Sequence, residues 1–280
     1  MLYQLLDKVA AMSKQHSKAT IISMAVIASA LETLLHEGVG HGVTAWLRGD
    51  IPTELTSNHL STMRPDRWVD AAGTLVNLIV GTGSLLASRM AGNRANMRYF
   101  FWIFAALNLL TGAGYFLFSG VFGFGDWYEV IHGLPHQAAL RIGMTVFGAG
   151  LYFLVVRLLA VSVHPFAPDR PTYNTVGRFP YYAACLFSCI AGALDPLGLK
   201  LLFVSTIPAA FGGLSGLMWA DGLMPRSATE WKLVVHREPA WWIAAVVLGI
   251  CYIVVLGRGI QFTGAVTLRH RRCRIELGVC

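Results

Sequence analysis

The sequence predicts an all-α fold, a polytopic bundle of transmembrane helices, from its composition and the lengths of its apolar segments. Hydrophobic residues make up 55% of the 280 residues, and charged residues only 13%. Apolar segments near the twenty residues that a helix needs to cross a bilayer recur along the chain. No linker divides the chain, so we expect one integral membrane domain over residues 1–280, with the lipid bilayer as a partner.

Five apolar segments are expected to cross the membrane without a break. They cover about residues 19–46, 69–90, 99–121, 140–163 and 241–256. Residues 181–219 are also apolar but are interrupted at Asp195-Pro196 and again at Pro208. This stretch predicts either two short spans, for seven in total, or one span with a re-entrant piece, for six. We expect six, because seven spans would put the basic tail on the outer side of the membrane.

The net charge of +7 is carried by short loops and by the two ends of the chain. This placement is typical of a membrane protein that sets its orientation, and it does not favour nucleic acid as a partner. The cationic residues concerned are Lys8, Lys14, Lys18, Arg89, Arg94, Arg98, Arg170, Arg178, Arg258, Arg269, Arg271, Arg272 and Arg274. We expect them to be cytoplasmic, with an even number of spans, in a multi-pass protein of a bacterial cytoplasmic membrane.

The first apolar segment contains the hexapeptide His36-Glu37-Gly38-Val39-Gly40-His41. Ionisable residues are costly to bury within a membrane and therefore indicate a functional site. A histidine followed by glutamate, with a second histidine close behind, is the pattern of a zinc hydrolase. In that pattern the histidines bind the metal, and the glutamate is the general base for a water molecule.

The two histidines are five residues apart, whereas the common zinc motif separates them by four. At about 100° per residue, a regular α-helix would turn His41 roughly 140° away from His36. A π-bulge would bring both onto one face, and such bulges are frequent at functional sites. Gly38 and Gly40 tolerate this distortion at low steric cost. The sequence therefore predicts that the helix departs from regular hydrogen bonding here.

A catalytic zinc site needs a third protein ligand and one open position. Asp126 is our first candidate, because it follows the third span in a glycine-rich loop, on the side where the first span ends. Asp195 is the second candidate, although an aspartate before proline also caps broken helices. Glu32, one turn before His36, is the third, or else it orients that histidine. A metal-free ion pair between Glu37 and His41 is an alternative to all three.

Three pieces of the chain together resemble the site-2 protease family of intramembrane zinc metalloproteases. His36-Glu37 with His41-Gly42 resembles the family's zinc motif, and the stretch from Ala72 to Asn77 resembles its glycine-rich span. Leu107 to Leu110 together with Asp126 resembles its third, ligand-bearing segment. The resemblance covers a metallopeptidase-like core within about residues 19–130. The chain departs from the pattern by one extra residue between the histidines, by Thr74 in place of proline, and by lacking Leu-Asp-Gly.

The longer histidine spacing has its own precedent, because the hexapeptide resembles that of dipeptidyl-peptidase III, a soluble zinc peptidase. Together the resemblances imply Zn²⁺ held by His36, His41 and Asp126, with Glu37 as the catalytic base. The expected function is an intramembrane zinc metalloprotease that cleaves a membrane-protein or peptide substrate.

Three other functions stay open. The same buried groups suit a metal or proton carrier without enzymatic activity, and an inactive protease-like scaffold is a further possibility. Gly212-Gly213-Leu214-Ser215-Gly216 resembles the serine motif of rhomboid proteases. Small-residue runs of this kind more often allow helices to pack closely.

Overall fold

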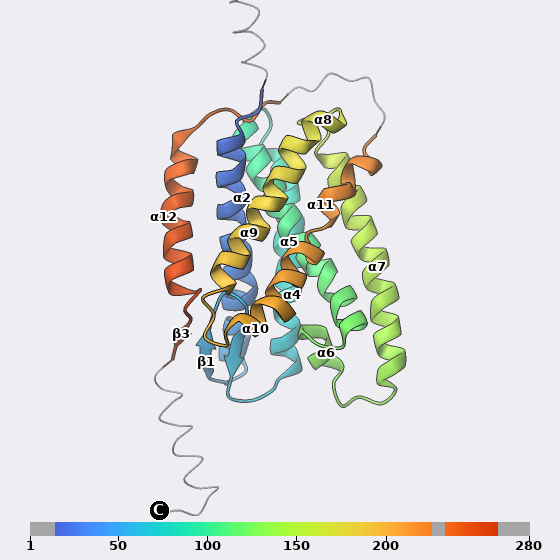
Figure 1. Cartoon of the computed structure of the whole chain (residues 1–280). Helices are drawn as coiled ribbons and strands as arrows, with labels where there is room; N and C mark the ends of the chain where they lie inside the picture. The colour runs from blue at the N-terminus through green and yellow to red at the C-terminus, as the bar shows by residue number, and fades with distance from the viewer. Residues whose placement is uncertain (1–14, 226–232, 263–280) are drawn as a thin grey trace, which may run out of the picture.

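The computed structural model describes residues 15–225 and 233–262 as a mostly helical bundle whose long helices run along one axis (Figure 1). Five helical segments in this part are long and apolar enough to cross a membrane, which supports an integral membrane protein. They are Lys18–Leu47, Arg67–Met90, Ala95–Phe122, Gln137–Ser162 and Leu199–Leu223. The helix α12, Pro239–Val255, is apolar but shorter.

The first half of the chain supplies the elements that surround the histidine motif. They are α2 (Lys18–Thr33), the π-helix η1 (Leu34–Val43), α3 (Thr44–Leu47), α4 (Arg67–Met90), α5 (Ala95–Phe122), α6 (Asp126–Ile131) and α7 (Gln137–Ser162). Side-chain caps define where two of the long helices begin. The Ser17 side chain accepts from the Thr20 amide, and the Asp66 side chain accepts from the Trp68 amide.

Helix α5 lies at the centre of the bundle and packs against α2, α4 and α7. Its residues Tyr99, Trp102 and Leu107 are almost fully buried in the main hydrophobic core. Two of the large polar side chains of α5 find partners in this core, as burial favours. The Tyr99 hydroxyl donates to the Val176 carbonyl at 2.7 Å, and the Trp102 indole donates to the Ser162 hydroxyl at 3.0 Å.

The second half of the chain is made of shorter pieces. They are α8 (Arg170–Tyr173), η2 (Asn174–Arg178), α9 (Phe179–Gly192), α10 (Leu199–Leu201), η3 (Leu202–Thr206), η4 (Pro208–Gly212), α11 (Gly216–Trp219) and η5 (Ala220–Leu223). Figure 1 shows α9 running down the bundle and the segment from α10 to α11 running back up. The chain therefore reverses at the Asp195 break and makes two passes over the stretch expected to be interrupted.

The two ends of the described chain lie at opposite ends of the bundle, because α2 begins at the top of Figure 1 and α12 ends at the bottom. This differs from the expected arrangement, in which the basic N-terminal and C-terminal segments share one side. The return pass after Asp195 accounts for the difference. Lys8, Lys14 and the arginines from Arg269 to Arg274 lie outside the described residues.

A small antiparallel sheet accompanies the helices, although the sequence predicted an all-α fold. Its strands β1 (Pro52–Leu55), β2 (Leu60–Thr62) and β3 (Ile260–Gln261) pair in the order β2-β1-β3. Pro52 pairs with Thr62, and Leu55 pairs with Ile260. The sheet thus joins the loop after the first span to the residues that follow α12.

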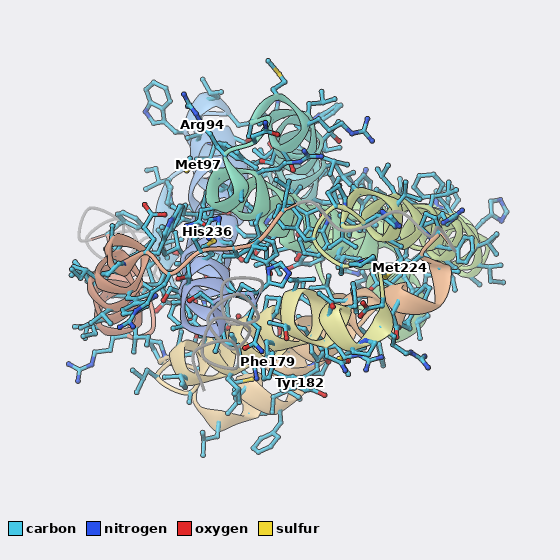
Figure 2. All side chains as sticks on the ribbon, turned by 90° about the horizontal axis from the view of Figure 1, so that it is seen from above. Arg94, Met97, Phe179, Tyr182, Met224 and His236 are labelled. Carbon is cyan, nitrogen blue, oxygen red and sulfur yellow. The ribbon has the colours of Figure 1, made fainter. Side chains whose placement is uncertain are left out.

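The end-on view in Figure 2 places α12 and α7 at opposite edges of the bundle. Arg94, Met224 and His236 are labelled there, at the end where α2 begins. The histidine motif lies toward the other end, where η1, α6 and the sheet are found.

Candidate metal centre

The histidine motif forms a π-helix, η1, which spans Leu34–Val43 within the first long helical segment. In this geometry the hydrogen bonds join residues five apart, so residues at that spacing share a face. His36 and His41 accordingly point the same way, and their Nε2 atoms lie 3.2 Å apart. The predicted departure from regular helical bonding is confirmed, and both imidazoles are buried.

Asp126 completes a group of three potential ligands. Its Oδ2 atom lies 3.1 Å from Nε2 of His36 and 3.5 Å from Nε2 of His41. The preceding turn contains Gly123 and Gly125, at φ angles of 69° and 92°, which only glycine adopts readily. This turn reverses the chain after α5, so the predicted approach of Asp126 to both imidazoles is confirmed.

The spacing of these atoms fits a tetrahedral metal ion. Ligand atoms with bonds of about 2.0–2.1 Å to a tetrahedral ion lie about 3.3–3.4 Å from one another. The three distances between the ligand atoms, 3.1, 3.2 and 3.5 Å, lie within a few tenths of an ångström of that value. The group of His36, His41 and Asp126 could therefore hold a metal ion.

The contact made by the second nitrogen of His41 sets the tautomer that a ligand needs. Its Nδ1 lies 2.6 Å from the Val69 carbonyl, which can only accept, so Nδ1 carries the proton. In the neutral ring, Nε2 then presents a lone pair toward His36 and Asp126. This backbone contact orients a metal-binding histidine in the way such contacts do in known metal sites.

Helix α4 closes one side of the group through two glycines. A Cβ built on Gly40 would lie 2.5 Å from the Gly73 Cα, so η1 and α4 touch at their backbones. A Cβ on Gly73 would lie 2.6 Å from Nε2 of His41 and 2.7 Å from Nε2 of His36. Any side chain at position 73 would therefore occupy the space between the ligand atoms. The resemblance noted the glycine-rich span but not this contact.

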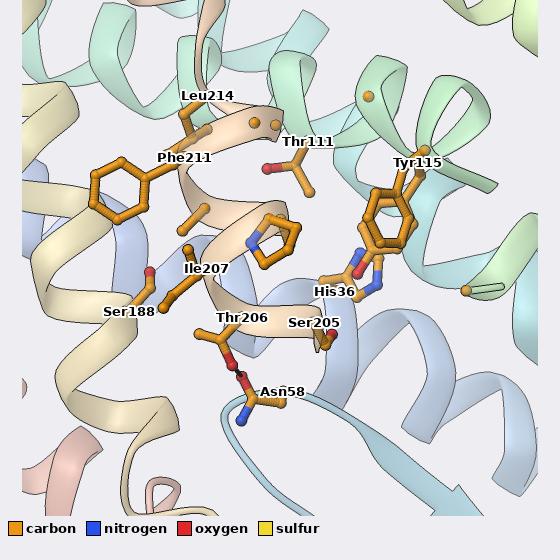
Figure 3. A pocket seen from close by; sticks show the side chains of 18 of the residues that line it. His36, Asn58, Thr111, Tyr115, Ser188, Ser205, Thr206, Ile207, Phe211 and Leu214 are labelled. Carbon is orange, nitrogen blue, oxygen red and sulfur yellow. Dashed lines mark hydrogen bonds between the residues drawn. The ribbon is translucent and has the colours of Figure 1, made fainter. Parts of the chain in front are cut away.

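Tyr115 of α5 covers the other side of His36. The two rings are stacked, with centroids 4.8 Å apart and an interplanar angle of 14° (Figure 3). This role was not predicted, because an aromatic residue in an apolar span usually packs against its neighbours. Nδ1 of His36 has no hydrogen-bond partner in the described part of the chain.

Of the other carboxylates named from the sequence, Glu37 lies beside the group, whereas Glu32 and Asp195 are hydrogen-bonded to other residues. Glu37 is buried, and its Oε2 has no hydrogen-bond partner among residues 15–225 and 233–262. Glu32 accepts from Asn77 at 2.6 Å and from Thr33 at 3.2 Å. Asp195 accepts from the Asn58 side chain and from the Leu197 amide, both at 2.9 Å. Neither Glu32 nor Asp195 therefore belongs to the ligand group.

Carboxylates outnumber cationic side chains around the group. Within the described residues, no lysine or arginine forms an ion pair with Glu32, Glu37 or Asp126. The groups within ion-pair distance of Asp126 are the two imidazoles, so either protonated histidines or a bound metal ion could balance its charge. The carboxylate within ion-pair distance of His41 is Asp126 and not Glu37, so the metal-free pair expected as an alternative does not form.

A cavity of about 790 Å³ adjoins the group. One wall is α5, with Thr111 and Tyr115, and the facing wall is the segment from Leu201 to Ser215. Figure 3 shows Phe211, Ile207 and Leu214 on that facing wall, with His36 on the far side of the cavity. His36, Glu37 and Asp126 all line it, so the candidate centre is open to a space large enough for a ligand.

The serine of the rhomboid-like motif has a different environment. Ser215 Oγ lies 3.3 Å from the Tyr152 hydroxyl, and no described histidine is hydrogen-bonded to it. His236 lies at the opposite end of the bundle from the candidate centre (Figure 2), and His270 is outside the described residues. A serine without a base is a weak nucleophile.

Comparisons with protein-family models, with curated proteins and with solved structures each find no match to this chain. The class of protein therefore follows from the fold and the site alone. This is a helical integral membrane protein with a candidate metal centre of two histidines and an aspartate.

Proposed function

We propose that the chain is an intramembrane zinc metalloprotease and that His36, His41 and Asp126 hold the ion. The observation that carries the proposal is the set of three potential ligand atoms, because the distances between them suit a tetrahedral ion. Two imidazoles and one carboxylate are a donor set of catalytic zinc sites, which keep a fourth position open. The resemblance to site-2 proteases in residues 19–130 supports the same assignment.

A bound zinc ion would polarise the scissile carbonyl and lower the pKa of a water molecule at the open position. Glu37 is the general base and, later in the reaction, the general acid. It lines the cavity beside the ligands, and its Oε2 has no other partner in the described chain. Glu37 takes the proton from the attacking water and later gives it to the amine of the leaving product.

The cavity supports a substrate that comes from the membrane. Its walls are mainly apolar, and the helices around it expose apolar side chains to their surroundings. A transmembrane helix hides its peptide bonds within its own hydrogen bonds. The substrate is therefore a span that unwinds locally inside the cavity before its peptide bond reaches Glu37.

The test combines zinc analysis of purified protein with cleavage of single-span peptides in proteoliposomes. The Glu37→Gln variant should retain zinc and lose cleavage by at least about a hundredfold, in line with removal of a general base. His36→Ala and His41→Ala should lose zinc and cleavage together. Glu129→Gln is the matched control, because Glu129 is an exposed carboxylate on α6 and should leave both unchanged. Absence of zinc from the wild-type protein would sink the proposal.

A second candidate is a metal or proton carrier, which the buried Glu32 favours. This carboxylate lines the cavity and is hydrogen-bonded to Asn77, yet hydrolysis does not require it. Intramembrane carboxylates often mark ion or proton paths. Zinc uptake by proteoliposomes that persists in Glu37→Gln and disappears in Glu32→Gln would favour the carrier over the protease.

A further inference from the structure

We infer that Arg141 of α7 is a positioning residue of the metal centre, because it holds in place the turn that carries Asp126. The inference rests on the zinc site of the proposed function but not on proteolysis. Arg141 lies outside the ligand group, and neither the zinc motif nor the family resemblance includes it.

The first link is the end of α5. The last carbonyls of a helix have no partner within the helix and need one from outside. Arg141 supplies it, because its Nε donates to the Gly120 carbonyl at 3.1 Å and its Nη2 donates to the Val121 carbonyl at 2.8 Å. The guanidinium therefore fixes α5 at the point where the chain leaves it.

The second link is the turn itself. Gly123 ends α5 at a φ angle of 69°, and a Cβ built there would lie 2.9 Å from Cζ of Arg141. The guanidinium thus occupies the space beside the Gly123 backbone, three residues before Asp126. A turn with two glycines is flexible by composition, and contact with a fixed planar group restricts it.

The third link is that Asp126 is held on its other side as well. The indole of Trp127 stacks on Phe116 of α5, with centroids 4.3 Å apart. Arg141 fixes the start of the turn and Trp127 fixes the residue after Asp126. A carboxylate bond to zinc tolerates only a few tenths of an ångström, so loss of either support should move Asp126 away from the imidazoles.

The helix α7 contains a matched control. Arg157, four turns further along the same helix, also donates to a carbonyl at a helix end, that of Leu223. Leu223 ends η5, which lies at the opposite end of the bundle from Asp126. Arg141→Gln and Arg157→Gln therefore remove similar contacts, but only the first is next to the ligand turn.

The experiment measures zinc affinity by competition with a chelator, together with thermal unfolding of the metal-free protein. Arg141→Gln should weaken zinc binding by about 10- to 100-fold, as loss of supporting groups does in other zinc sites. Arg157→Gln should bind zinc like the wild type while losing a similar amount of thermal stability. In the cobalt-substituted protein, only Arg141→Gln should change the visible absorption spectrum.

Arg141→Lys is a second variant for the case in which Arg141→Gln does not fold. Lysine keeps the charge but donates from a single point, so its zinc affinity should fall between those of the wild type and Arg141→Gln. Wild-type affinity in both Arg141 variants, or an equal loss in Arg157→Gln, would overturn the inference and leave the zinc site standing. A wild type that binds no zinc would remove both together.

Discussion

The metal centre and the facing wall of the cavity are built differently. On the metal side, η1 and α4 meet through Gly40 and Gly73 with their backbones in contact. On the facing side, the segment Leu199–Leu223 is loosely enclosed: 28% of its most apolar window is buried inside the protein, compared with 61% for α5. The metal centre is held by close packing, whereas the facing wall is held by a few side-chain contacts.

Two of the contacts that hold the facing wall are hydrogen bonds in which a tyrosine hydroxyl donates to a backbone carbonyl. The segment contains the short π-helices η3 and η4 and also Pro208, all of which interrupt regular α-helical hydrogen bonding. The hydroxyls of Tyr181 and Tyr152 donate to the carbonyls of Phe211 and Gly213, at 3.1 and 2.7 Å. We therefore expect that the metal site and the facing wall can be altered separately, because different contacts stabilise them.

The largest effect is expected from Gly73→Ala, which disturbs the close packing around the metal centre. The new methyl group would lie within 3 Å of both Nε2 atoms, so the imidazoles must move apart. We expect at least about a hundredfold loss of zinc affinity, given the strict geometry of zinc ligands. Zinc competition measures it, and Gly83→Ala on the same helix is the control because nothing lies near its Cβ. Equal affinity in both variants would show that the glycine contact does not hold the site.

An intermediate effect is expected from Tyr152→Phe, which loosens the facing wall. The lost hydroxyl donates to Gly213, accepts from the Gly216 amide and contacts Ser215. We expect a loss of about 1–3 kcal/mol in unfolding free energy, with zinc affinity unchanged. Thermal unfolding in detergent measures it. Tyr182 is an exposed tyrosine on α9, so Tyr182→Phe should leave both quantities as they are. A fall in zinc affinity for Tyr152→Phe would contradict the independence of the metal centre and the facing wall.

The smallest effect is expected from Thr206→Val, where the facing wall meets the hairpin. The Thr206 hydroxyl donates to Oδ1 of Asn58 at 2.8 Å, and Asn58 keeps its own bond to Asp195. We expect about 0.5–1.5 kcal/mol of lost stability, measured in the same unfolding experiment. Thr82→Val is the control, because that exposed hydroxyl bonds only within its own helix. No difference between the two variants would mean that the hairpin contact adds nothing.

The parts of the site that the sequence predicted are those that depend on local geometry. The five-position spacing of the two histidines and the two glycines between them were enough to predict the distorted helix, which η1 confirms. A glycine-rich loop after the third span was enough to predict that Asp126 returns to the imidazoles. Whether these residues bind zinc stays a prediction.

The parts that the sequence did not predict depend on contacts between distant segments. The position of Gly73 over the ligands is set by the register of α4 against η1, which no local pattern encodes. The strands β1 and β2 have four and three residues, too short for a clear alternation of apolar and polar positions. The sequence left the return pass after Asp195 open, because the interrupted apolar stretch suits two short spans as well as one span with a re-entrant piece.

The strand β3 ties the far end of the described chain to the hairpin beside the cavity. Ile260 pairs with Leu55 in β1, while the hairpin tip, Ser57 to His59, lines the cavity. A protein shortened after Val255 would keep all three candidate ligands but expose β1 as an unpaired edge, open to other extended chains. Reporter tags and purification handles are therefore better joined beyond Phe262 than in place of the residues before it.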